Sequence, residues 1–397
     1  MNSLQAGLGI APFNIPGWEQ TQDKTPLVSR CLMLDDGETR FVIVSGTFLE
    51  MWQPEAMMIR DAVSKATGLP LDHILLAGTH VHSGPSTLTG DREKRQLYAR
   101  CIATASAEAA RAASALRPVR IGYATDRLPG VSRVRRILRR DGKVITLRRA
   151  WPQYWGWATD PETVGPEEPL DDLLTVVRIE DLDGKPIGAV MHFTCHPIPD
   201  YFGYAARLVE QNNPGLVCLI LNGCFGSVDA PFEVPMRGKT QADQLPILGD
   251  ILGCRTLELL ARAETTDQAR LGITRRPVFL PMDPRFLDNP ASKSDIWSDA
   301  VAKMGFETEV QFLHIGDLAF AGIPGEPQVG FGRDIQAASP FKLTRAIGNA
   351  NHSCAFLFYE ANRARGGYEC DPAHWGLVTG QGLVTILAAI KECLAGL

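Results

Sequence analysis

The chain has 397 residues, 45% of them hydrophobic, which is enough to bury a large core. Its 40 basic and 45 acidic residues give a net charge of −5, so nothing in the overall charge supports a nucleic-acid partner. No leader pattern opens the chain, no apolar stretch approaches the ~18 residues of a membrane span, and the nine cysteines form no CxxC pair, so we expect a cytoplasmic protein without a membrane span.

The first part of the chain alternates predicted strands and helices. Apolar runs bounded by turn-forming residues indicate the strands, and an alanine-rich composition indicates the second helix. The predicted elements are a strand at 41–45, a helix at 54–66, a strand that starts at 74 and ends at the histidines 80 and 82, and a helix at 95–116. Alternation of this kind is typical of α/β folds.

The stretch 126–168 departs from this order. It contains a cluster of arginines and then a cluster of aromatic residues: Arg133, Arg135, Arg136, Arg139 and Arg140, followed by Trp151, Tyr154, Trp155 and Trp157. We interpret the stretch as a surface excursion over the core, either a lid or a pocket wall. The aromatic part is compatible both with an apolar pocket for an acyl chain and with a packed core patch.

Strands and helices resume after this stretch. The predicted strands are 174–179, 187–194, 216–221 and a hairpin of 312–315 with 318–321; the predicted helices are 204–211, 244–263 and 382–394. The hairpin is indicated by Gly316-Asp317, a favoured turn composition, and the proline-rich segment 277–295 is expected to be irregular. We therefore predict an α/β fold with a mixed β-sheet core and flanking helices, in one large domain over residues 1–397.

Two histidines follow the predicted strand that starts at residue 74. In an extended chain residues i and i+2 face the same way, so His80 and His82 would point into one pocket while Val81 packs behind them. The turn formers 83–85 place both imidazoles at a strand end, where ligands collect in α/β folds. Both could bind a metal, or one could bind while the other handles protons; a pair of hydrogen-bonded surface histidines is the structural alternative.

Two further metal ligands are predicted after other strands. His196 follows the strand 187–194, and His192, four residues earlier, would share its face and could support it. Glu326 lies between prolines in Ile323-Pro-Gly-Glu-Pro, a rigid turn that would hold its carboxylate in place. Two imidazoles and a carboxylate with one open position form the ligand set of a catalytic zinc, so we expect a metal-dependent hydrolase.

Taken together, these segments resemble the neutral/alkaline non-lysosomal ceramidase family, specifically its N-terminal catalytic domain. The resemblance runs nearly end to end and rests on Thr79-His-Val-His-Ser-Gly-Pro85, His192-Phe-Thr-Cys-His-Pro197, Asp200-Tyr-Phe-Gly-Tyr-Ala, Ile323-Pro-Gly-Glu326 and Gly367-Tyr-Glu369. It implies one zinc ion per chain and a small-molecule substrate whose amide (N-acyl) or ester bond is hydrolysed. We expect no C-terminal accessory module after this domain, and the resemblance leaves open whether the substrate is a lipid.

The resemblance also assigns roles to single residues. It implies that zinc is bound by His80, His196 and Glu326. The second histidine of the first motif, His82, would stay off the metal and would polarise the scissile carbonyl or stabilise its oxyanion.

Further oxyanion donors follow from the same resemblance. The tyrosine of the last motif, Tyr368, is one of them. An arginine from the segment Gly130-Val-Ser-Arg-Val-Arg-Arg would also lie in the pocket, and either Arg133 or Arg135 fits this place.

Two departures from the family pattern bear on the metal. The family's fourth zinc ligand is a tyrosine, and its place twelve residues before Tyr368 is taken by Phe356, which cannot bind metal. The site would then be a three-ligand zinc with water, a zinc with a relocated ligand such as His352 or Tyr359, or a site that holds metal poorly.

The second departure lies in the family's GDxxP loop. Ser227 takes the place of the aspartate, and Asp229, two residues later, is a candidate to compensate for it. Both departures support a competing hypothesis, in which the chain is a catalytically degenerate binding protein of the same fold.

Overall fold

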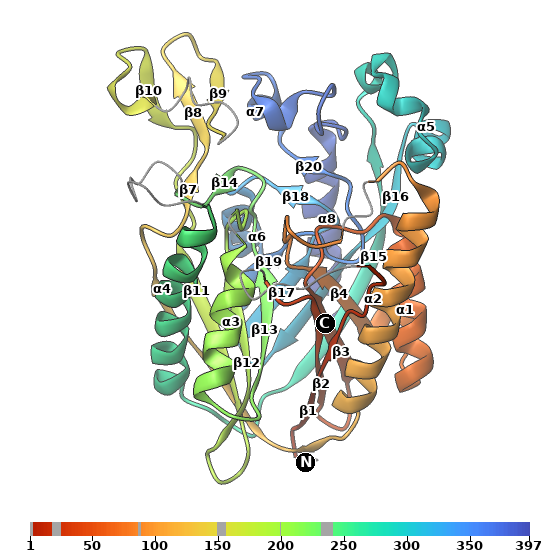
Figure 1. Ribbon diagram of the computed structural model, residues 1–397, viewed down its shortest axis with the longest axis vertical. Coiled ribbons are helices and arrows are strands. Elements are labelled where there is room, and N and C mark those ends of the chain that lie inside the picture. Colours follow the sequence, from red (N-terminus) through yellow and green to blue (C-terminus); the bar gives the residue numbers. More distant parts are fainter. Residues whose placement is uncertain (1–2, 18–24, 86–88, 149–155, 199, 232–240) are drawn as a thin grey trace.

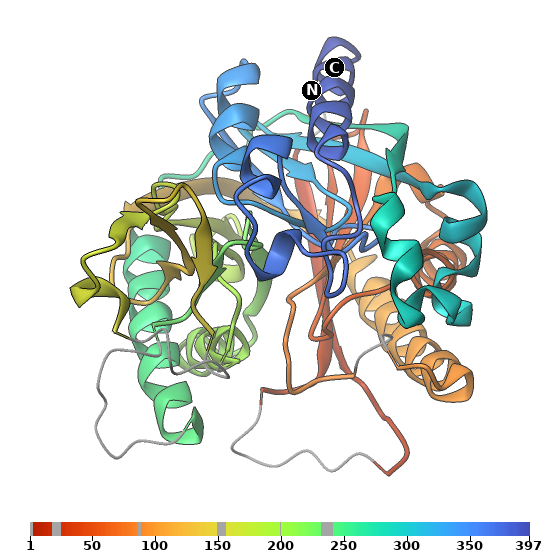
Figure 2. The same ribbon diagram turned by 90° about the horizontal axis from the view of Figure 1, so that it is seen from above.

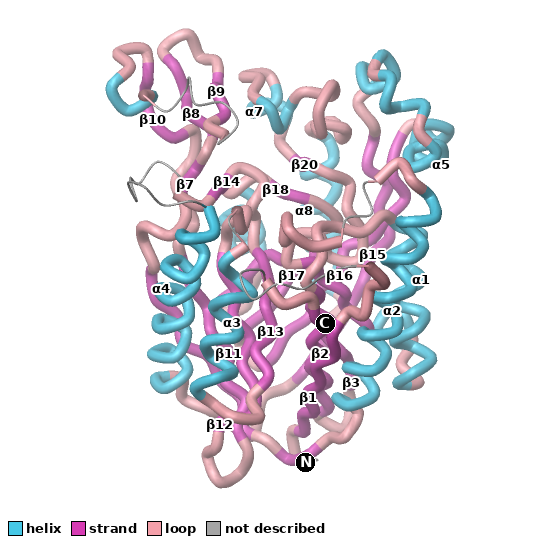
Figure 3. The backbone as a smooth tube through the Cα atoms, in the orientation of Figure 1, coloured by secondary structure: helices cyan, strands magenta, loops and turns pink. Residues whose placement is uncertain are grey.

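The computed structural model describes residues 3–17, 25–85, 89–148, 156–198, 200–231 and 241–397. Three sheets turn one face towards a common apolar core, and a separate group of helices covers the outer face of each (Figures 1 and 2). In Figure 3 the strands accordingly lie inside and the long helices outside. This arrangement is the predicted α/β fold with mixed sheets and flanking helices, which is confirmed.

The first sheet is built from the N-terminal part of the chain. Its strands, in the order β4-β3-β2-β1-β5, are β1 (Gln5–Pro12), β2 (Val28–Asp35), β3 (Arg40–Gly46), β4 (Ile74–Gly78) and β5 (Arg117–Pro118). It is covered by α1 (Gln53–Thr67) and α2 (Arg92–Ala113). Side chains alternate along β2 as an extended chain requires, with Leu32 and Leu34 facing the common core and Cys31 and Met33 facing the helices. The predicted strand 41–45 and both predicted helices are confirmed.

The second sheet has the order β13-β12-β11-β6 and is mixed, because β12 and β13 run parallel while the other pairs are antiparallel. Its strands are β6 (Arg120–Arg127), β11 (Leu173–Glu180), β12 (Pro186–Phe193) and β13 (Val217–Asn222). The helices α3 (Tyr201–Asn212) and α4 (Gln241–Arg262) cover its outer face. All of the strands and helices predicted between 174 and 263 are confirmed.

The third sheet has the order β15-β16-β17-β19. Its strands are β15 (Leu271–Pro281), β16 (Gly305–Ile315), β17 (Leu318–Gly322) and β19 (Leu343–Ile347), with the helices α5 (Ser298–Lys303), α6 (Phe331–Ala338) and α8 (Gln381–Ala395) around it. The predicted hairpin is confirmed, since Ile315 pairs with Leu318. The prediction that 277–295 is irregular is wrong for residues 277–281, which belong to β15. Strand β15 lies at the sheet edge, where a proline without an N–H need not interrupt the ladder.

The stretch 126–168 forms a small sheet of its own in the order β10-β8-β9, which stands at one end of the molecule (Figure 1). Its strands are β8 (Arg136–Arg139), β9 (Val144–Thr146) and β10 (Thr163–Pro166), and β7 (Arg133–Val134) pairs with β14 (Val228–Asp229) just before it. The surface prediction does not hold for two of its arginines, because Arg135 and Arg136 are buried. Trp151, Tyr154 and Trp155 lie outside the described residues, so the acyl pocket stays a prediction.

Three short elements lie near this end. They are β18 (Glu326–Pro327), β20 (Phe356–Leu357) and α7 (Glu360–Arg363), with a 3₁₀ turn at Tyr368–Cys370. None of the described helices combines the length and apolar character needed to traverse a bilayer.

Candidate metal centre

Each of the three sheets delivers a candidate ligand to the same place. The chain leaves β4 at Gly78 just before His80 and His82, leaves β12 at Phe193 before His196, and leaves β17 at Gly322 before Glu326. These strand ends point towards the small strands β14 and β18 in Figure 1. The side chains meet because all three sheets pack against the common core.

Three imidazoles and one carboxylate come together there. The ring centroids of His80 and His196 lie 4.7 Å apart, and those of His80 and His82 lie 4.8 Å apart. One ligand atom from each of the three histidines lies within 4.8 Å of the others. Glu326 Oε2 is 3.0 Å from His196 Nε2 and 3.7 Å from His80 Nε2. The structure therefore brings all four of these predicted site residues together.

The hydrogen bonds of the buried rings define which nitrogen of each ring is available. His196 Nδ1 lies 2.8 Å from the Phe225 carbonyl oxygen, and His80 Nδ1 lies 3.1 Å from that of Leu49. A carbonyl oxygen only accepts, so we assign the proton to Nδ1 in both rings. The Asn349 amide nitrogen is placed 3.0 Å from His80 Nδ1 and its amide oxygen has no partner, so we assign this amide with its oxygen facing the His80 N–H. The lone pairs of both Nε2 atoms are then left facing Glu326, as in histidines that bind a metal through one nitrogen and are oriented through the other.

Glu326 completes the argument for a cation. Among the described residues its buried Oε2 has no hydrogen-bond donor. A carboxylate oxygen that faces two imidazole lone pairs is costly to bury unless a cation or a proton lies between them. A divalent metal would satisfy all three atoms at once, so His80, His196 and Glu326 fit a metal ion, with His82 beside them.

The pKa shifts in the cluster agree with this reading. Burial raises the pKa of Glu326 to about 8, against the opposing positive charge of Arg135. Burial, together with the charge of Arg135, lowers the pKa of His196 to about 3. Burial also lowers the pKa of His80 well below its ordinary value. Both imidazoles are therefore neutral near pH 7, which is the protonation state that a metal ligand needs.

The predicted extended conformation of His80-Val81-His82 is wrong. Strand β4 ends at Gly78, and His80 has a φ of +63° in the left-handed region. The backbone N–H of His80 donates to the Phe48 carbonyl at 3.1 Å, which turns the chain out of the strand direction. As a result the two rings meet almost at a right angle, with 88° between their planes.

Asp200 holds the turn that carries His82, and the sequence analysis did not single it out for a role. Its buried carboxylate accepts the backbone N–H of His82 at 2.7 Å through Oδ1 and that of Ser83 at 2.8 Å through Oδ2. Its own carbonyl accepts the hydroxyl of Thr25. Both carboxylate oxygens are therefore needed to fix the strained turn after His80.

Replacing Asp200 with asparagine is expected to weaken zinc binding about 10- to 100-fold, the usual effect of removing a hydrogen bond that orients a metal ligand. The amide has only one acceptor oxygen, so one of the two N–H groups loses its partner. Competition with a chromophoric chelator measures the affinity.

Asp91→Asn is the matched control for Asp200→Asn, because Asp91 caps α2 through the Lys94 N–H. The control should leave zinc affinity unchanged. Equal zinc affinities for the Asp200 variant and the wild type would contradict the role of the turn.

Asn222, the last residue of β13, connects two of the strand ends. Its amide oxygen accepts the backbone N–H of Cys195 at 3.2 Å, and its amide nitrogen donates to the Cys195 carbonyl at 2.8 Å and to that of Thr79 at 3.5 Å. It therefore bridges the segments just before His196 and His80. The sequence signal for it is weak, namely one polar residue after the apolar run 216–221.

Glu50 is a second buried carboxyl group that the sequence analysis missed. Ser353 donates to its Oε2 at 2.7 Å, and the neighbouring Leu49 supplies the carbonyl that binds His80. Burial raises the pKa of Glu50 to about 8, and the charge of Glu326 adds to the shift. Two carboxyl groups thus share this part of the core and repel each other's charge.

Phe356 lies beside the cluster, at the register position of the expected tyrosine. Strands β18 and β20 pair in parallel with Glu326 opposite Phe356, and the Phe356 ring centroid lies 6.1 Å from that of His196. The two proposed replacement ligands have other contacts. His352 packs against the Phe306 ring at 6.3 Å, and the Tyr359 hydroxyl donates to an Asp334 oxygen at 2.8 Å.

The changed GDxxP loop lies behind His196. The Ser227 hydroxyl accepts the Val329 N–H at 3.0 Å, so it holds the loop instead of facing the cluster. Asp229 Oδ1 lies 3.9 Å from His196 Nδ1, and the two residues form a β-bridge. Asp229 therefore lies beside the candidate ligand His196, and the sequence analysis considered it as a replacement for the missing aspartate.

Arg135 and Arg136 belong to a buried network of charges. Arg135 donates to Glu369 at 2.7 Å, to Asp229 at 3.0 Å and to the Gly226 carbonyl at 2.8 Å. Arg136 donates to the other oxygen of Glu369 at 2.9 Å and to Glu167 at 2.6 Å. Pairing of this kind offsets the cost of burying the charges. It also engages Arg135 with carboxylates, so its role as an oxyanion donor stays a prediction.

The remaining predicted site residues lie on two sides of this network. Arg133 lines a cavity of about 490 Å³ together with Trp157 and Leu170. The Tyr368 ring lies 5.8 Å from that of Phe356, and the guanidinium carbon of Arg148 lies 3.8 Å from the Tyr368 ring centroid. Arg148 is a residue that the sequence analysis did not consider, because nothing in its local sequence separates it from the neighbouring arginines.

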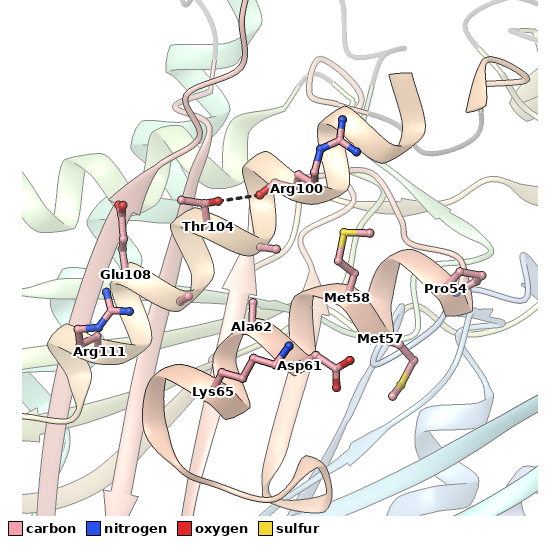
Figure 4. Close-up of a pocket in the computed structure, with 12 residues that line it drawn as sticks. Pro54, Met57, Met58, Asp61, Ala62, Lys65, Arg100, Thr104, Glu108 and Arg111 are labelled. Carbon is pink, nitrogen blue, oxygen red and sulfur yellow. Dashed lines mark hydrogen bonds between the residues drawn. The ribbon is translucent and has the colours of Figure 1, made fainter. Parts of the chain in front are cut away.

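A groove of about 780 Å³ lies elsewhere, between α1 and α2 (Figure 4). Met57, Met58, Asp61 and Arg100 are among the residues that line it. None of its lining residues belongs to the candidate metal centre, so the groove is separate from the site.

Comparison with known proteins identifies the fold. No protein family and no curated protein sequence matches the chain. Solved structures do, among them neutral ceramidase from Pseudomonas aeruginosa, with a TM-score of 0.73, and a ceramidase complexed with C2, with a TM-score of 0.74. Each shares 17% sequence identity with this chain. Both matches cover 100% of this chain, and they cover 74% of the first structure's chain and 75% of the second's. The chain therefore has a neutral ceramidase-like fold, as the motif resemblance implied.

Proposed function

We propose that the chain is a zinc-dependent hydrolase that cleaves an amide (N-acyl) or ester bond of a small molecule. The observation that carries the proposal is the convergence of His80 Nε2 and His196 Nε2 on the buried Glu326 Oε2, which has no hydrogen-bond donor among the described residues. The neutral ceramidase-like fold supports the same chemistry, because ceramidases hydrolyse an N-acyl bond. We propose one zinc ion per chain; the cytoplasmic location and the single-domain organisation stay predictions.

The residues around the ligands suit hydrolysis. When bound, zinc would lower the pKa of a coordinated water towards neutrality and polarise a carbonyl group. Glu326 or the neighbouring Glu50 would accept the proton of the attacking water. His82, on the solvent side of the cluster, would hydrogen-bond the scissile carbonyl oxygen, and the Tyr368 hydroxyl would donate to the oxyanion, each donor contributing ~3 kcal/mol.

A catalytically degenerate binding protein is the second candidate. Phe356 favours it, because an apolar ring lies beside His196 where the family pattern has a metal-binding phenol. Such a protein would keep the pocket but would bind metal weakly or not at all.

Metal analysis and a hydrolysis assay together separate the two candidates. We expect about one zinc per purified chain by mass spectrometry and release of fatty acid from N-acyl amides or esters. Chelation should abolish release and added zinc should restore it. Zinc without hydrolysis of any acyl substrate would favour the binding protein, and absence of zinc even after incubation with it would refute the metal centre.

A further inference from the structure

The candidate site has a buried side and an accessible side. Its buried members are His80, His196, Glu326 and Phe356. Its accessible members are His82, which is exposed, and Tyr368 and Arg148, which are half-buried. A substrate that approaches the buried ligands therefore meets the accessible three first, and two of these, Tyr368 and Arg148, are hydrogen-bond donors at any pH near neutrality.

Arg148 is held in place at this entrance. It follows β9, and its guanidinium lies over the Tyr368 ring at 3.8 Å from the centroid, well inside cation–π distance. The Tyr368 backbone N–H donates to Thr146 Oγ1 at 3.0 Å, and that hydroxyl donates to Glu369 at 2.8 Å. The end of β9 and the turn that carries Tyr368 are thus tied together, which fixes the guanidinium relative to the ring.

Arg148 is connected to the histidine cluster through two aromatic rings. The Tyr368 ring beneath it lies 5.8 Å from the Phe356 ring, and the Phe356 ring lies 6.1 Å from that of His196. Of the nearby carboxylates, Asp229 and Glu369 bind Arg135, and Glu369 also binds Arg136, whereas Glu326 lies on the buried side of the cluster. The accessible wall of the site therefore has a cationic character.

We propose that Arg148 makes the site selective for substrates that carry an anionic group, a carboxylate or a phosphate, close to the scissile bond. The inference rests on the proposed hydrolase function and deepens it. A guanidinium binds these groups through paired N–H donors. Because the contact with Tyr368 already restricts its rotamers, Arg148 loses little further freedom when it binds the anion. A neutral amide of the same size has no group to use this contact.

The test compares three substrates with one acyl chain: N-acylglycine, N-acylethanolamine phosphate and neutral N-acylethanolamine. Wild type should prefer an anionic substrate in kcat/KM by about tenfold or more, the effect of a charge-assisted hydrogen bond. Arg148→Gln should lose about 10- to 100-fold on it, mainly through KM, and less on the neutral substrate, which lacks the ionic contact. Arg148→Lys should recover part of the loss. Of the two anionic substrates, the one whose kcat/KM falls more in Arg148→Gln is the preferred one.

Arg207→Gln is the matched control. Arg207 is also half-buried, and its guanidinium carbon lies 4.5 Å from the centroid of a tyrosine ring, that of Tyr204. Both residues belong to α3 and not to the candidate site, and Tyr204 packs against Gly249 of α4. The Arg207→Gln variant should hydrolyse all three substrates like wild type. Binding of N-acylglycine and of N-acylethanolamine phosphate to chelator-treated protein, measured by calorimetry, gives a second readout without turnover, and Arg148→Gln should weaken binding of the preferred anion about tenfold or more.

The outcomes separate this inference from the proposed function. Hydrolysis that favours the neutral substrate, or an equal loss of kcat on all three substrates in Arg148→Gln, would overturn anion selection and leave the hydrolase intact. Binding of either anion that depends on Arg148 in a protein that hydrolyses nothing would support the anion site and refute the hydrolase.

Discussion

Replacing Glu326 with glutamine is expected to remove stoichiometric zinc from the protein and to abolish hydrolysis, while stabilising the metal-free protein. The Glu326 carboxylate faces both Nε2 atoms, so zinc affinity should fall at least about 100-fold, beyond the usual effect of changing a group that only orients a ligand. Without metal, the buried Glu326 carboxyl must hold a proton near pH 7 that the unfolded chain does not hold, and an amide removes this cost, worth ~1–3 kcal/mol. Metal analysis and urea unfolding in chelator measure the two effects.

Loss of zinc together with a gain in the stability of the metal-free protein distinguishes a metal ligand from a residue that only supports the fold. Glu258→Gln is the control, because Glu258 is exposed on α4 and pairs with Arg255 and Arg262. It should change neither zinc content nor stability appreciably. A Glu326 variant that kept one zinc per chain would contradict the assignment, and so would one that lost stability in chelator.

Metal-free protein is expected to become less stable as the pH rises from about 7.5 to about 8.5. Burial raises the pKa of both Glu50 and Glu326 to about 8, whereas both groups titrate near 4.5 in the unfolded chain. In this interval the folded protein keeps a proton that the unfolded chain has lost, so the free energy of unfolding falls by ~1.4 kcal/mol per pH unit for each such proton. The buried histidines have lowered pKa values and titrate near 6.5 in the unfolded chain, so above about pH 7.5 they are neutral in both states and contribute little.

Urea unfolding at several pH values in the presence of chelator measures this slope. Glu50→Gln should flatten it, because one of the two raised carboxyl groups is gone and Glu326 no longer has a charged neighbour. The exposed Glu258→Gln should leave the slope as it is in wild type. A free energy of unfolding that stays level or rises between about pH 7.5 and 8.5 would show that neither buried carboxyl group is protonated in the folded protein.

The local elements of the fold were readable from the sequence because each is a short-range pattern. The apolar run at 41–45 and the Gly316-Asp317 turn predicted β3 and the β16–β17 hairpin correctly. The error at 277–281 arose because proline is excluded from central strands but tolerated at an edge, and position within a sheet is not a local property. How the three sheets share one core also depends on contacts between distant segments.

For the site, the sequence alone determined which residue types follow the strand ends, and hence the candidates His80, His82, His196 and Glu326. It did so because a metal site needs particular donor atoms and because apolar runs mark where strands end. Only the tertiary structure decided how these residues meet. The left-handed turn at His80, the contact between Asp200 and His82 across 118 residues, and the position of Arg148 over Tyr368 all depend on long-range contacts. No local pattern specifies them, because each partner lies far away in the chain and on a different element.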